Sequence, residues 1–107
     1  MFAVMSDSQL GMDGFQVTFK NGFLVSVQFG RFSYAEFNES NIPIRAEVAV
    51  IKASSREFVK LGKYDDVLGW QTPERVTSIM HWVSCLPADI SVEKAEKICQ
   101  WAVTPSE

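Results

Sequence analysis

The chain has 107 residues, of which 47% are hydrophobic and 21% are charged, a balance typical of one globular domain and unlike that of a disordered chain. The net charge is −3 at pH 7, and the basic residues are scattered, which disfavours binding to nucleic acid. No apolar run approaches the roughly 20 residues that cross a bilayer, and no basic residue precedes Lys20 as a signal peptide would require. We therefore expect a cytoplasmic protein that is not bound to a membrane.

The first part of the chain predicts a short arm followed by a β-hairpin. Residues 1–13 show no clear periodicity and are expected to form a loosely ordered arm before a single domain over residues 14–104. Two segments then alternate apolar and polar residues, as half-buried strands do. Their apolar members are Phe15, Val17 and Phe19, and then Phe23, Val25, Val27 and Phe29.

The turn between these two strands can be predicted from their register. A two-residue turn at Asn21-Gly22 would place the two apolar sets on opposite faces of the sheet. A three-residue loop instead pairs Phe19 with Phe23 and puts both sets on one face, which a common core requires. We therefore predict a bulged turn with Gly22 in the left-handed region.

The middle of the chain predicts two more strands separated by loops. Residues 30–43 form a long connection, and residues 44–53 then have an apolar centre on both faces, which is typical of a central strand. Residues 58–61 predict a short fourth strand, and residues 62–70 a loop.

Two helices complete the predicted fold. Thr72 is a preferred N-cap followed by Pro73, and Ser91 is a second N-cap candidate. Apolar residues follow each cap at helical spacing, and Pro87 ends the first helix. The short connection makes the helices antiparallel neighbours. The fold class is therefore α+β, an antiparallel sheet of about four strands with two C-terminal antiparallel helices packed on one face.

Residues that carry chemistry are few and do not form a recognised catalytic set. His81 lies one helical turn from Cys85, a spacing that could activate a thiolate, but a surface histidine beside a small hydrophobic residue is the commoner arrangement. Asp65 and Asp66 fit a solvated turn better than a cation site. Cys85 and Cys99 could form a disulfide if the helices pair, although two free thiols are commoner in a cytosolic protein. We therefore predict no enzyme activity, metal or cofactor.

The best candidates for binding residues are aromatic. Arg31, Phe32, Tyr34 and Phe37 share one long loop, where exposed rings would anchor a partner; alternatively, these rings fold back as a satellite of the core. Trp82 and Trp101 lie off their helix stripes. They either cover the seam between the helices or form an exposed patch for a partner or a second copy.

Three segments of the chain are similar to a family of small, largely uncharacterised proteins of tailed bacteriophages. The segments read FKNGFLVSVQFG over residues 19–30, AEVAV over residues 46–50, and LGWQTPERV over residues 68–76. The resemblance spans residues 14–86, and the family often has a shorter loop after the second strand. It implies a phage accessory protein in the host bacterial cytoplasm and supplies no catalytic residue.

Two functions are consistent with these observations. The first is a non-enzymatic protein that binds and modulates or inhibits a host factor, such as a component of antiviral defence, through the aromatic residues described above. The second is sequestration of a small nucleotide-like ligand between the 30–43 loop and the helices, with Arg31 or Arg75 on its phosphate.

Overall fold

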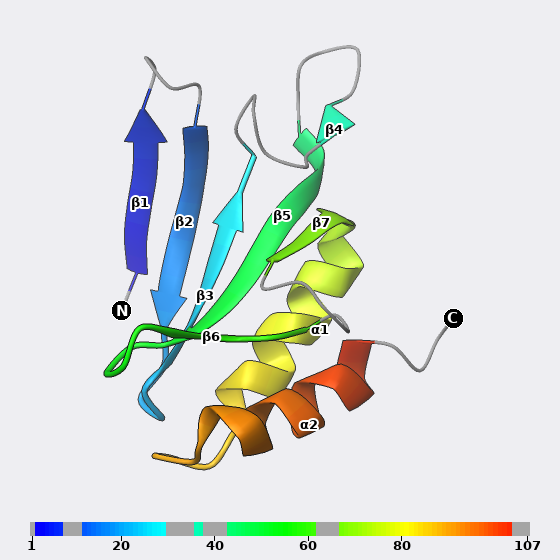
Figure 1. Ribbon diagram of the computed structural model, residues 1–107. Helices are drawn as coiled ribbons and strands as arrows, with labels where there is room; N and C mark the ends of the chain where they lie inside the picture. The colour runs from blue at the N-terminus through cyan, green and yellow to red at the C-terminus, as the bar shows by residue number, and fades with distance from the viewer. Residues whose placement is uncertain (1, 8–11, 30–35, 38–42, 62–66, 104–107) are drawn as a thin grey trace.

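The computed structural model describes residues 2–7, 12–29, 36–37, 43–61 and 67–103. They form two layers, an antiparallel sheet and a pair of helices on one of its faces (Figure 1). The α+β class and the strands-then-helices order predicted from the sequence are thereby confirmed. The strands are β1 (Phe2–Asp7), β2 (Met12–Thr18), β3 (Phe23–Gln28), β4 (Glu36–Phe37), β5 (Pro43–Lys52), β6 (Glu57–Val59) and β7 (Val67–Gln71), and the helices are α1 (Pro73–Ser84) and α2 (Val92–Val103).

The sheet is organised around β5. The strands β1, β2, β3, β5 and β4 follow one another in that order, and β6 and β7 both pair with β5 as well. Consecutive residues Val48, Ala49 and Val50 of β5 are all buried, so the strand is covered on both faces. This agrees with the prediction of a central strand, because only such a strand needs apolar residues at consecutive positions.

The hairpin of β2 and β3 has the predicted register. Phe15 pairs with Val27 and Val17 with Val25, and the amide of Phe19 donates a hydrogen bond of 2.9 Å to the carbonyl of Phe23. Gly22 has a φ of +91°, a conformation that L-residues rarely adopt. The three-residue loop is therefore confirmed, and it places both apolar sets toward the helices.

The sheet has more strands than the sequence predicted, seven within the described residues rather than about four. Residues 2–7, expected in a loosely ordered arm, form β1 and pair with β2 along their whole length. Residues 67–71, expected mostly in a loop, form β7, and β4 lies within the long 30–43 connection. These segments have weak strand patterns of their own, and pairing with an existing strand supplies what local propensity does not.

Both predicted helix caps are present. The hydroxyl of Thr72 accepts a hydrogen bond from the amide of Arg75 at 3.3 Å, and that of Ser91 accepts one from the amide of Lys94 at 3.2 Å. Pro73 occupies the first turn of α1. These side chains satisfy amides that an uncapped helix leaves without an acceptor.

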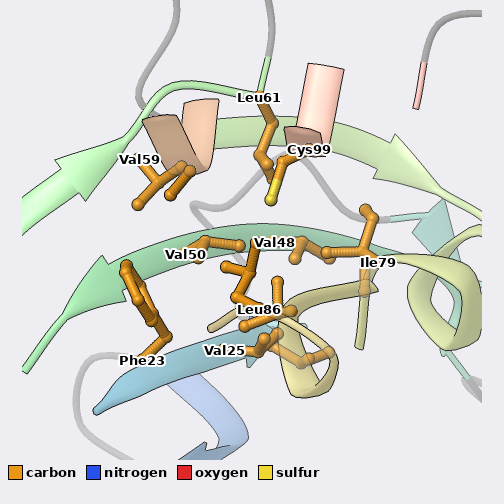
Figure 2. Packing of buried hydrophobic residues seen from close by; sticks show 13 residues of the cluster. Phe23, Val25, Val48, Val50, Val59, Leu61, Ile79, Leu86 and Cys99 are labelled. Carbon is orange, nitrogen blue, oxygen red and sulfur yellow. The ribbon is translucent and has the colours of Figure 1, made fainter. Parts of the chain in front are cut away.

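The core lies between the sheet and the helices (Figure 2). Its sheet side is formed by alternate residues of β3 and β5, and its helix side by residues on the inner faces of α1 and α2. Leu61 and Cys99 lie beside one another at one end of this layer (Figure 2). The buried members of the cluster are Phe23, Val25, Val27, Ala46, Val48, Val50, Val59, Leu61, Ile79, Val83, Leu86, Ala95 and Cys99.

The helices cover only part of the sheet. They contact β3, β5 and β6, whereas β1 and β2 extend sideways beyond them (Figure 1). We call β3, β5 and β6 the covered half of the sheet, and β1 and β2 the projecting half.

Candidate partner-binding surface

The structure describes only some of the binding residues predicted from the sequence. Arg31, Phe32 and Tyr34 lie outside the described residues. Phe37 belongs to β4, where it pairs with Pro43, but its side chain lies outside the described part of the chain. The same is true of the side chain of Trp101 in α2.

The described candidates, Arg75 and Trp82, lie at opposite ends of α1. Arg75 is half-buried in the first turn. Trp82 lies in the last turn and keeps 44% of its surface exposed. Of the two arrangements considered from the sequence, seam packing and an exposed patch, the position of Trp82 corresponds to the exposed one.

Trp82 is exposed because of the periodicity of α1. The helix turns Ile79 and Val83 into the core, where they are 2% and 0% exposed. Residues at the complementary spacing of i, i+3, i+4 and i+7 must then point away from the sheet. These residues are Ser78, His81, Trp82 and Cys85, which are all exposed, and we call them the α1 outer stripe.

The side chains of the α1 outer stripe contact one another. The rings of His81 and Trp82 meet edge to face, with centroids 6.1 Å apart and planes 74° apart, a geometry that aromatic pairs favour. The Sγ of Cys85 lies 4.0 Å from the Nε2 of His81, at the outer limit of a hydrogen bond to sulfur. The stripe therefore presents an indole, an imidazole and a thiol to solvent within one and a half turns of helix.

The two cysteines differ in their surroundings. Both are free thiols, Cys85 exposed and Cys99 buried, so the disulfide considered from the sequence is not formed. Burial raises the pKa of Cys99 from 9.0 to about 11, because the charged thiolate loses its solvation. Cys99 is therefore an inert core residue near neutral pH.

The C-terminal end of α1 is held by the first hairpin. The Asn21 amide Nδ2 donates hydrogen bonds to the carbonyls of Val83 at 2.8 Å and Leu86 at 3.0 Å. Its Oδ1 accepts a hydrogen bond from the amide of Phe23 at 3.1 Å. One side chain thus closes its own turn and satisfies carbonyls at the end of a helix more than 60 residues away.

The sequence analysis assigned Asn21 to the hairpin turn and did not predict this contact. Two features of the sequence point toward such a contact. An asparagine needs only its carbonyl oxygen for a turn of this kind, so its two N–H donors remain available. Pro87 follows the helix and cannot donate to its last carbonyls. The distant partner itself could not be identified without the fold.

Comparisons with known proteins do not assign a family. No known protein family, characterised protein or solved structure gives a significant match to this chain. No helix in the described part of the chain is long and apolar enough to span a membrane. Among residues 2–7, 12–29, 36–37, 43–61 and 67–103, no three His, Cys, Asp or Glu side chains are grouped as metal ligands would be.

Proposed function

We propose that the protein is a non-enzymatic accessory protein that binds and modulates or inhibits a host factor, with Trp82 as an anchor of its contact surface. The exposure of Trp82 is the observation that carries this proposal, because tryptophan is enriched among the residues that contribute most to binding near the centre of interfaces. The resemblance to phage proteins favours a bacterial partner, such as a component of antiviral defence.

The contacts that hold α1 and the indole of Trp82 in place fit the role of an anchor. Ile79 and Val83 fix the inner side of α1 in the core, Asn21 holds its C-terminal end, and the ring of His81 lies against the indole. A side chain that is already ordered loses little conformational entropy when a partner covers it. The burial of the indole would then contribute to affinity with little opposing cost.

A matched pair of variants tests the proposal. Tagged full-length protein is used to capture partners from host lysate, and the captured protein is then purified and its affinity measured. We expect Trp82→Ala to weaken binding by at least about 2 kcal/mol, as loss of a central anchor does. The control is Phe58→Ala on β6, because Phe58 is 39% exposed and neighbours the buried Val59, so it faces away from the helices. Equal effects of the two variants on affinity, or none, would remove Trp82 from the contact surface.

The loop predicted from the sequence is tested in the same assay. A double variant, Phe32→Ala with Tyr34→Ala, should also reduce capture while the melting temperature stays within a few degrees of the parent protein. A large fall in melting temperature would instead assign these rings to the core. A rise in melting temperature with any member of a nucleotide panel would favour the ligand-binding alternative.

A further inference from the structure

The two long edges of the sheet are built differently. On one side, β5 is bordered by β4 with two residues, β6 with three and β7 with five, each covering a different part of the strand. On the other side, the sheet ends at β1, a continuous strand of six residues that pairs with β2 from Phe2 to Asp7. Within the described residues, β1 therefore offers the longest uninterrupted row of main-chain groups at an edge.

The strand β1 lacks the features that usually protect a sheet edge. Natural edge strands carry lysine, proline, a bulge or an inward charge, because an unpaired apolar strand is a template for another strand. The sequence of β1 is Phe-Ala-Val-Met-Ser-Asp, without lysine, arginine or proline, and its register with β2 is continuous. Its only charge is Asp7 at one end, and Phe2 at the other end is 79% exposed.

We infer that β1 pairs antiparallel with β1 of a second copy of this chain, so that the two sheets join across a two-fold axis at Val4. The unpaired groups on the outer side of β1 require an extended strand, and a second copy supplies one of equal length. In this register Val4 lies opposite Val4 of the second copy and Ala3 lies opposite Met5, so apolar residues meet at the centre. No bulge or proline interrupts the ladder on either side.

The charges of the strand are compatible with this arrangement. In this register the two Asp7 residues lie on opposite sides of the axis, six residues apart along the strands. At about 3.4 Å per residue this is a separation of roughly 20 Å. That distance exceeds the Debye length of about 8 Å at physiological ionic strength, so the repulsion between the two carboxylates is screened.

The position of the helices also permits this pairing. Because β1 and β2 extend beyond the helices (Figure 1), no described element stands between the outer edge of β1 and an approaching chain. Phe2, which has no covering helix, gains a neighbouring strand in the dimer. This edge lies apart from the α1 outer stripe, so dimer formation and partner binding are separate properties.

Sedimentation of the full-length chain over a concentration series tests the inference. We expect a reversible monomer–dimer equilibrium that Val4→Lys shifts toward monomer, raising the dissociation constant by at least about tenfold, because charges at an edge strand oppose pairing. The matched control is Phe58→Lys on β6, which adds the same charge at the other side of the sheet and should leave the dissociation constant unchanged. A monomer at every concentration, or equal effects of the two substitutions, would overturn the inference.

Hydrogen exchange of the unsubstituted protein gives a second readout that does not depend on whether a variant folds. The amides of residues 2–7 should become more protected as the concentration rises through the dissociation constant, and those of α1 should not. Concentration-dependent protection confined to α1 would assign the interface to the α1 outer stripe and overturn the inference.

Discussion

In the covered half of the sheet, Phe23, Val25 and Val27 of β3 are at most 1% exposed, whereas Phe2 in the projecting half is 79% exposed. The strands that carry these residues, β3 and β1, are both paired with at least one neighbour, and both contain large apolar residues. The difference is the second layer, because α1 packs over β3 and β5 and α2 packs over β6, whereas β1 extends beyond both helices (Figure 1). The comparison teaches that the free energy of folding is concentrated under the helices, and that the edge strand β1 is left available for contacts with other chains.

The most severe test of this comparison is removal of a large side chain from the covered half. Phe23→Ala should lower the free energy of unfolding by about 3–5 kcal/mol, because it removes a fully buried ring and leaves a cavity. Urea unfolding followed by circular dichroism measures the change. The control is Leu24→Ala, since Leu24 is only half-buried and lies on the other face of the same strand. A loss at position 24 as large as that at position 23 would contradict a hydrophobic cluster that lies on the helix side of β3.

An intermediate effect is expected where the hairpin meets the helix. Asn21→Ala should lower the free energy of unfolding by about 1–3 kcal/mol, because it leaves the carbonyls of Val83 and Leu86 without their donor. Asn21→Asp should cost more at neutral pH, since it removes the donors and also places a negative charge at the negative end of the helix dipole. Thermal unfolding of both variants, with Lys20→Ala as the exposed neighbouring control, measures the difference. An aspartate variant as stable as the parent would show that the turn alone explains the choice of asparagine.

The smallest effect is expected in the projecting half. Phe2→Ser should change the free energy of unfolding of the monomer by no more than about 0.5 kcal/mol, because a side chain that remains exposed gains little from folding. Chemical unfolding at a concentration where the protein is monomeric measures this value. A loss comparable to that of Phe23→Ala would show that a part of the chain covers Phe2 and that the two halves are equivalent.

The sequence predicted the elements with strong periodicity or specific local chemistry. The hairpin register followed from the requirement that Val17 and Val25 share a face, and the caps at Thr72 and Ser91 followed from side chains that act within three residues. The central strand followed from consecutive apolar residues around Ala49. In each case the determining interaction is local or repeats at a fixed period.

The elements that were missed depend on distant partners. The strands β1 and β7 become strands by pairing with β2 and β5, and no local pattern specifies that pairing. Similarly, Asn21 could be assigned to a turn, but its contact with Val83 required the position of α1. Within the candidate surface, helical phase predicted that Trp82 lies off the apolar stripe. It did not decide between the seam and solvent, because that depends on where α2 packs.

The number of neighbours of each strand has a consequence for how the molecule opens. The strand β5 pairs with β3, β4, β6 and β7, so it cannot leave the sheet without breaking four sets of main-chain hydrogen bonds at once. We therefore expect its amides to exchange with solvent through unfolding of the entire protein. Within the described residues, β1 pairs with β2 alone, so we expect it to detach while the rest of the fold remains native. The chain therefore combines one strand whose opening is global with one that can open, close and change partners by itself.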